Sequence, residues 1–153
     1  MLKIFPARKQ HDRATKKHLS EFYKKRGLFF AVLTGIFMIY LGKKFVIWRK
    51  KHGEKRGKII GVLAMFDLGR FFNKRIAWLD GIFIDRRERG QGLGKRTLAK
   101  LHSLISRRGF SHLLLWSRDN VKTFYYKVGF KNLFANFFWK RIKKYQNRKK
   151  LKG

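Results

Sequence analysis

The chain contains no cysteine, and this absence removes several kinds of chemistry at once. Without thiols it has no disulfide, no thiolate metal site and no cysteine nucleophile. Proline is almost absent as well, and the single Pro6 marks no linker between domains. Acidic residues are scarce, with 8 Asp and Glu against 40 Lys and Arg, so few carboxylates are available to hold a cationic substrate.

A run of residues long enough to cross a membrane is missing too. A transmembrane helix needs about 20 apolar residues, whereas the apolar segment 28–41 has only 14. We expect this segment to form a buried helix, or a helix plus a strand; the alternative is a membrane-surface anchor, helped by the cations that flank it. The basic first 27 residues show a weak helical periodicity at Ala14, Leu19, Phe22 and Tyr23.

These first residues resemble an organelle targeting segment only mildly, because Ser and Thr are sparse in them. The sequence therefore favours the cytoplasm, with an organelle matrix as the alternative. At 153 residues the chain predicts one domain over 1–153, with a basic N-terminal segment and a basic tail from about 140 to 153.

What the chain has in excess is positive charge. Its formal net charge is +32 and its isoelectric point is near 11.4. Such a surplus repels itself in the folded state and attracts polyanions. The expected partner is a nucleic acid, with RNA favoured and a ribosome or other ribonucleoprotein as one setting, while an anionic membrane ranks behind. The alternative is a merely solvated surface, although such surfaces normally mix both signs.

Hydrophobic patterning predicts an alternation of strands and helices. The expected strands are 44–49, 58–66, 75–84, 112–116, one near 130–131 and 137–141, and turns are expected over 51–57 and 67–74. The expected helices are 93–108, ended by Gly109, and a short one over 120–127.

The most informative stretch is residues 89–94, which read Arg-Gly-Gln-Gly-Leu-Gly. They lie between a strand and a helix, an order that points several backbone N–H groups and the positive end of the helix dipole at one spot. Gly90, Gly92 and Gly94 keep side chains away from that spot and permit the backbone angles that a bound anion needs. We therefore expect a ligand that carries phosphate.

Two common phosphate motifs do not fit this loop. A P-loop would need a glycine at Arg89 and a hydroxyl residue at Arg96. A dinucleotide fingerprint would need its third glycine at Lys95 and an acid about 20 residues later, where 113–116 offers none.

The pattern Arg-x-x-Gly-x-Gly over 89–94 instead resembles motif A of the GNAT superfamily of N-acetyltransferases, in which the loop binds the pyrophosphate of acetyl-CoA. A second stretch, 124–130, reads Phe-Tyr-Tyr-Lys-Val-Gly-Phe and resembles the family signature F-Y-x-K-x-G-F. The resemblance covers roughly 58–131. It implies an α/β (α+β) fold with a mixed, mostly antiparallel sheet of about six to seven strands flanked by helices, and acetyl-CoA as co-substrate with no metal.

The resemblance also implies which residues bind the coenzyme. Backbone N–H groups of Phe83 and Ile84 would bind the thioester carbonyl, and residues 82–84 would pair with the pantetheine arm. Asn120 would bond the same arm, although it lies about two residues closer to Tyr125 than the family pattern has it. The full implied set is Ile82, Phe83, Ile84, Arg89, Gly90, Gln91, Gly92, Leu93, Gly94, Lys95 and Asn120.

Two residues are the implied acid and base. Asp80, nine positions before Arg89, matches the strand carboxylate that deprotonates the amine, and its short side chain favours a bridging water. The alternative is an edge charge paired with a cation. Tyr125, four positions before Gly129, matches the tyrosine that protonates the departing sulfur; the alternative is an aromatic packed on the sheet, and Tyr126 is a weaker candidate.

The spacing of the histidines and serines indicates neither a metal site nor a serine nucleophile. His11, His18, His52, His102 and His112 lack the spacing of metal ligands, and Ser103, Ser106, Ser111 and Ser117 lack a nucleophile-elbow context. We therefore expect neither a metal site nor a hydrolase.

Two functions are compatible with these features. The first is an acetyltransferase whose acceptor amine is presented on or beside nucleic acid: a ribosomal protein terminus, a lysine of a nucleic-acid-binding protein, or an aminoacyl-tRNA. The second is a non-catalytic RNA-binding subunit of a ribonucleoprotein, in which the basic ends thread between RNA segments and aromatics near 134–145 stack on bases.

Overall fold

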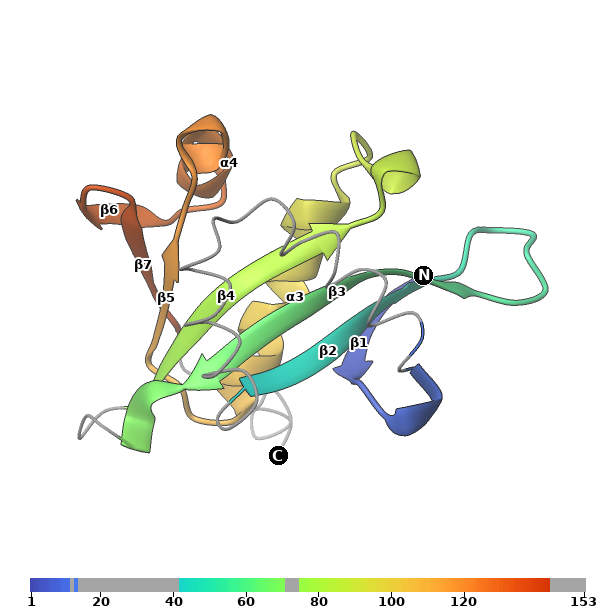
Figure 1. The fold of residues 1–153 in the computed structure, drawn as a ribbon, viewed down its shortest axis with the longest axis horizontal. Helices are drawn as coiled ribbons and strands as arrows, with labels where there is room; N and C mark the ends of the chain where they lie inside the picture. Colours follow the sequence, from blue (N-terminus) through green and yellow to red (C-terminus); the bar gives the residue numbers. More distant parts are fainter. Residues whose placement is uncertain (12, 14–41, 71–74, 144–153) are drawn as a thin grey trace, which may run out of the picture.

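The computed structural model describes residues 1–11, 13, 42–70 and 75–143 (Figure 1). The expected buried segment 28–41, the periodicity expected from Ala14 to Tyr23 and the tail beyond residue 143 lie outside this part of the chain. Within it, no helix is both long and apolar enough to cross a membrane.

A seven-stranded sheet forms the centre of the molecule, in the order β1-β2-β3-β4-β5-β7-β6. All neighbouring strands are antiparallel except β4 and β5, which are parallel. This confirms the predicted fold class. The strands are β1 Leu2–Pro6, β2 Gly42–Arg49, β3 Lys58–Asp67, β4 Ile76–Ile84, β5 His112–Trp116, β6 Lys131–Phe134 and β7 Phe137–Arg141. Within the described residues the helices are α3 Leu93–Arg107 and α4 Lys122–Lys127, with short 3-10 turns at Lys9–His11, Leu68–Arg70, Arg86–Glu88 and Asp119–Val121.

The N-terminal end of the described chain differs from expectation. Residues 2–6, expected within a weakly helical basic segment, form the edge strand β1, which pairs with β2 from Leu2 opposite Arg49 to Pro6 opposite Phe45. The pairing partner lies far along the sequence, so local periodicity gives no sign of it. At the other end, the strand expected over 137–141 is confirmed as β7, so Lys140, also expected at the start of the basic tail, lies within a strand.

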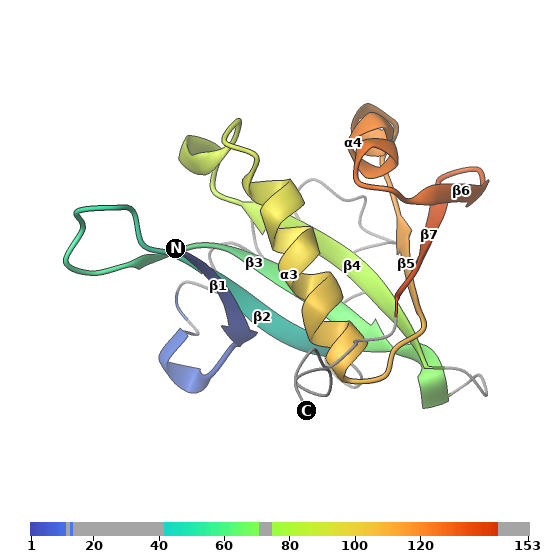
Figure 2. The ribbon, with the colours of Figure 1, turned by 180° about the vertical axis from the view of Figure 1, so that it is seen from behind.

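Helix α3 lies across one face of the sheet (Figure 2) and buries Leu93, Leu98, Leu101 and Ile105 against it. With the buried Thr97, which lies four residues after Leu93 and four before Leu101, these positions follow the helical repeat and form one mostly apolar stripe. The helix ends at Gly109, as predicted: with φ of 78°, this glycine donates its N–H to Ser106 at 3.0 Å while the next N–H reaches Ile105 at 3.1 Å. That pair of bonds is a Schellman cap.

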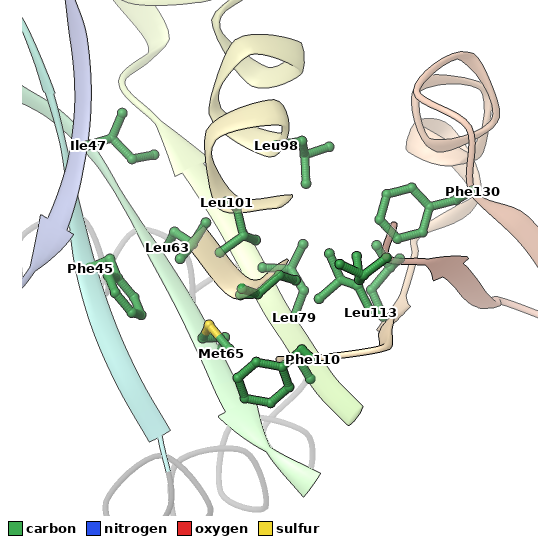
Figure 3. Close-up of a cluster of buried hydrophobic side chains, with 14 of the residues drawn as sticks. Phe45, Ile47, Leu63, Met65, Leu79, Leu98, Leu101, Phe110, Leu113 and Phe130 are labelled. Atoms are coloured by element: carbon green, nitrogen blue, oxygen red, sulfur yellow. The ribbon is translucent and has the colours of Figure 1, made fainter. Parts of the chain in front are cut away.

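The main core lies between α3 and the sheet (Figure 3). It joins side chains of β1, β2, β3, β4, β5, β7 and α3 with three residues outside these elements. The members labelled in Figure 3 are Phe45, Ile47, Leu63, Met65, Leu79, Leu98, Leu101, Phe110, Leu113 and Phe130. Ala64 and Phe66 form a smaller cluster with Leu68 and Trp78.

Strands β4 and β5 stay together for only part of their length. Their pairing runs from Ile76 opposite His112 to Leu79 opposite Leu115, whereas β4 continues to Ile84. Beyond Leu79 the two strands diverge, and α3 and α4 begin on either side of the opening (Figure 1). The second half of β4 therefore has β3 along one edge and an opening along the other.

Candidate active site

A cleft of about 740 Å³ occupies the opening between β4 and β5. Four segments line it: residues 80–84 of β4, most of the loop and first turn of α3 over 89–95, most of residues 116–121 from the end of β5 onward, and Phe124, Tyr125, Lys127 and Val128 of α4 and its C-terminal end. Every predicted site residue lines this cleft except Gln91. The fold thus brings together segments that are separated by about forty residues in the sequence.

Asp80 lies in this cleft because β4 has a bulge. Ala64 of β3 faces Gly81 and Met65 faces Leu79, so no β3 residue stands opposite Asp80. A bulge inserts one residue and re-aims the side chains on either side of it. The carboxylate is 4% exposed and lines the cleft. Its role as base stays a prediction.

The peptide groups of β4 alternate between β3 and the cleft. Asp85 donates its N–H to Ile60 of β3 at 2.8 Å, and a methyl group added to Gly61 of β3 would meet the Phe83 carbonyl oxygen. Because backbone direction alternates along a strand, the peptide groups of Ile82 and Ile84 face the cleft. In agreement, the Ile84 carbonyl accepts a bond from Arg89 Nε at 2.9 Å.

The glycine-rich loop has the conformation that its sequence predicts. Gly90 and Gly92 have φ of 77° and 66°, a region that residues with a side chain rarely adopt. Gly92 is also the N-cap of α3, so the free N–H groups of the first helical turn open beside it. Gly94 leaves room for a neighbouring side chain, because a methyl group there would lie 3.2 Å from the ring of Phe124 across the cleft.

A buried ion cluster fixes this loop to the sheet. Glu88, 4% exposed, accepts a bond from Arg49 Nη1 at 2.6 Å, and its other oxygen lies 2.7 Å from Lys58 Nζ. The hydrogen bond from the Lys58 ammonium, with the charges of nearby cations, holds the pKa of Glu88 below its ordinary value. The same Arg49 nitrogen reaches Gln91 Oε1 at 2.7 Å. We call Arg49, Lys58, Glu88 and Gln91 the loop anchor.

Sequence reasoning missed most of the loop anchor. Arg49 and Glu88 are 39 positions apart, and no spacing rule joins them. The one available signal was local: Glu88 is the single acid in the run Arg-Arg-Glu-Arg over 86–89. An acid in such a basic run is a candidate for a buried ion pair.

Tyr125 lies in the wall of the cleft, on α4. Its ring is 5.2 Å from that of Phe124, 5.6 Å from Phe130 and 6.1 Å from Phe138, so aromatic packing holds it in place. Tyr126, by contrast, is 52% exposed and does not line the cleft. Asn120 lines the cleft from the 3-10 turn before α4. The roles proposed for Tyr125 and Asn120 stay predictions.

No group of three or more metal-ligating side chains occurs within the described residues. Among the histidines, His102 on α3 is partly buried, and this burial, with the charge of Lys140, lowers its pKa.

Comparison with known families agrees with this geometry. The family model described as "Acetyltransferase (GNAT) domain" matches residues 42–132, more than half of the chain. The chain therefore belongs to the GNAT acetyltransferases, and it is an N-acetyltransferase that uses acetyl-CoA.

Solved structures of the same fold are similar over almost the whole chain. Tetrahymena GCN5 has a TM-score of 0.69 at 14% identity, covering 96% of this chain and 99% of its own. A putative N-acetyltransferase from Lactobacillus plantarum has a TM-score of 0.71 at 15% identity, covering 93% and 99%. AtaTR bound with AcCoA has a TM-score of 0.66 at 16% identity, covering 92% and 93%. At these identities the likeness concerns the fold.

Proposed function

We propose that this N-acetyltransferase acts on an amine that a nucleic acid presents, either on a protein bound to RNA or on an aminoacyl-tRNA. The observation that carries the proposal is the net charge of +32. Acetyl-CoA brings only a few negative charges, so the coenzyme alone does not account for this surplus. A free polyamine is a poor acceptor here, because a strongly cationic protein repels cations.

The distribution of the acids supports the same conclusion. Over the described ranges they are Glu54, Asp67, Asp80, Asp85, Glu88 and Asp119. Two of them, Asp80 and Glu88, are buried, and Asp119 pairs with Lys122 at 2.7 Å. Few negative charges are therefore left on the surface to offset its cations, so a polyanionic carrier would meet a surface of nearly one sign.

The cleft suits the chemistry of acetyl transfer. The loop 89–94 and the start of α3 would hold the coenzyme's pyrophosphate through backbone N–H groups. The N–H groups of Ile82 and Ile84 face the cleft and would donate to the pantetheine arm and to the thioester oxygen as negative charge develops on it. The peptide group of Phe83 alternates with these and faces β3, so for Phe83 we propose a place in the cleft wall rather than a bond to the thioester.

We assign proton transfer to the carboxylate and the phenol among the residues that line the cleft, Asp80 and Tyr125. Asp80 takes a proton from the acceptor amine, through a water molecule, so that the neutral nitrogen attacks the carbonyl carbon. The N–C bond forms, the C–S bond breaks, and Tyr125 gives its proton to the departing sulfur. Solvent then returns a proton to Tyr125 and takes one from Asp80, which balances the cycle.

The two assignments are tested by Asp80→Asn and Tyr125→Phe. Losing a general acid or base costs about 10²- to 10⁴-fold in kcat, while the dissociation constant of acetyl-CoA should change little because neither group holds the pyrophosphate. Tyr126→Phe is the matched control, since Tyr126 is the exposed neighbour on the same helix. A kcat for Tyr125→Phe equal to that of the control would remove Tyr125 from the mechanism.

The acceptor class is tested by transfer of radiolabelled acetyl from acetyl-CoA into ribosomes, charged tRNA and total protein, with and without prior nuclease treatment. We expect label in at least one of these fractions and a strong reduction after nuclease. Label only in free small amines, or an unchanged yield after nuclease, would contradict the proposal. Stoichiometric co-sedimentation with ribosomes without any label would favour the non-catalytic RNA-binding subunit instead.

A further inference from the structure

The outer face of α3 carries positive charge and no acid. The exposed residues of this helix are Lys95, Arg96, Ala99, Lys100, Ser103 and Arg107, and its fifteen residues include no Asp or Glu. We call Lys95, Arg96, Lys100 and Arg107 the α3 basic face. Because the apolar stripe of the helix turns toward the sheet, these side chains lie on the opposite, outer side, which Figure 2 shows in front of the sheet.

This arrangement is unfavourable for an isolated helix. Lys95 and Arg96 are in the first turn, where the helix dipole is positive and favours acids. Arg96 and Lys100 are like charges at i and i+4, a pair that destabilises a helix by about 0.2–0.5 kcal/mol. A helix that only faces water would gain from acids at such positions. A bound polyanion would neutralise these cations, so the same residues would then stabilise the complex.

The coenzyme does not explain the α3 basic face. Of its four residues only Lys95 lines the cleft, whereas Arg96, Lys100 and Arg107 do not. The row from Arg96 to Arg107 spans about 16 Å along the helix axis. It begins beside the mouth of the cleft and leads away from it along the outside of the molecule.

We infer that the α3 basic face binds the phosphate backbone of single-stranded RNA. The surface would hold the carrier of the acceptor amine, so this assignment rests on the proposed function and adds a location to it. A row of cations one residue wide matches one strand. Proteins that read the sequence of duplex DNA insert a whole helix into its major groove. Helix α3 lies flat on the sheet and exposes only its outer side, so it cannot enter a groove in this way (Figure 2). Exposed single strands are the usual recognition elements of RNA.

A lipid surface suits the α3 basic face less well. Helices that lie in a membrane interface insert large apolar residues beside their cations. Here the exposed residues between the cations are Ala99 and Ser103, which offer almost no apolar area to insert.

The test compares two triple variants that remove the same charge. The first is Arg96→Gln, Lys100→Gln and Arg107→Gln; the matched control is Lys51→Gln, Lys55→Gln and Arg56→Gln, three exposed cations of the β2–β3 loop. Binding to a fluorescent 20-nucleotide oligo(U) is measured by anisotropy between 0.1 and 1 M salt, without acetyl-CoA. Equal acetyl-CoA affinity and melting temperature confirm that both variants are folded.

Each phosphate contact to a single strand contributes about 0.7 to the slope of log K against log salt. Three lost contacts should therefore lower the slope by about 2 and weaken binding about 100-fold at 0.1 M, with little change at 1 M. The control should keep most of the wild-type slope.

Each other outcome overturns a defined part of the proposal. Equal losses in both variants would mean diffuse attraction rather than a binding face, and no loss in the α3 variant would place the RNA elsewhere; either result leaves the proposed function standing. Tighter binding of duplex RNA, of the matching DNA strand or of phosphatidylserine vesicles would overturn the choice of single-stranded RNA. Wild-type protein without RNA affinity would contradict the proposed function itself.

Discussion

Replacing Glu88 by glutamine should loosen the glycine-rich loop 89–94 without unfolding the protein. The carboxylate is buried and joins Arg49 of β2 and Lys58 of β3 to the turn that precedes Gly90. Glutamine keeps the shape of the side chain and can accept one bond, but it carries no charge. Arg49 keeps its hydrogen bond to Gln91, so one of its two contacts with this segment remains in the variant.

The magnitude follows from the burial of the partners. A hydrogen bond between charged groups that are mostly removed from water contributes about 1.5–3 kcal/mol, and the Arg49 side chain is only 17% exposed. Lys58 extends into solvent, so water replaces its lost partner. For a domain of this size each kcal/mol moves Tm by about 2–4 °C, so the expected fall in Tm is about 3–12 °C.

The assay combines calorimetry with steady-state kinetics. If the loop binds the pyrophosphate as proposed, that contact is the same in the ground state and the transition state. A loosened loop should then raise KM for acetyl-CoA several-fold while kcat stays within about twofold. Glu54→Gln, which makes the same charge change in the β2–β3 loop, is the control. If Glu88→Gln lowers Tm and raises KM no more than the control does, the loop anchor has no role in holding the loop.

The same variant has a predictable pH dependence. Because the pKa of Glu88 is lowered from 4.5 in the folded protein, its ion pair contributes its full stability above pH 4.5 and loses it as the pH falls through the folded-state value. The difference in Tm between the wild type and Glu88→Gln should therefore shrink below pH 4.5. A constant difference down to pH 3 would contradict this reading.

Three further changes test other parts of the structure. Gly94→Ala should leave the free energy of unfolding within about 1 kcal/mol, since alanine favours a helix, yet raise KM for acetyl-CoA because the methyl group presses on Phe124 at 3.2 Å; an unchanged KM would mean that the ring moves freely. Gly61→Ala should destabilise by more than about 2 kcal/mol in urea titrations, because its methyl group meets the backbone oxygen of Phe83, which cannot turn away. The lowered pKa of His102 makes the fold less stable as the pH falls below 6.5, so His102→Gln should flatten Tm between pH 6.5 and 5, and an unaltered slope would exclude it as the cause.

Features that depend on local patterns were predictable from the sequence. The five alternating residues of β5, the start of α3 after Gly92 and the glycine that ends the helix all carry their signal within a few positions. The glycine-rich loop also belongs here, because its unusual backbone angles demand glycine wherever they occur.

Features that depend on distant pairing were not predictable. β1 becomes a strand only because β2, which begins at residue 42, provides its hydrogen-bond partner. The bulge that re-aims Asp80 follows from the register between β3 and β4, and the loop anchor follows from two strands and a turn meeting in space. No window of neighbouring residues contains either relation. The sequence therefore indicated most of the residues that line the cleft but not the contacts that hold them in place.

The short pairing between β4 and β5 has a consequence for the stability of the whole molecule. Four residue pairs join the half of the sheet formed by β1 to β4 to the half formed by β5, β7 and β6. The remaining length of β4 can form hydrogen bonds with a ligand that lies alongside it. An extended pantetheine arm would lie along β4 in place of a neighbouring strand, and its contacts with both halves would hold them together. Acetyl-CoA should then raise Tm by a large amount for so small a ligand. A redesign that extends the pairing between β4 and β5 would make the protein more stable, but it would close the cleft to the co-substrate.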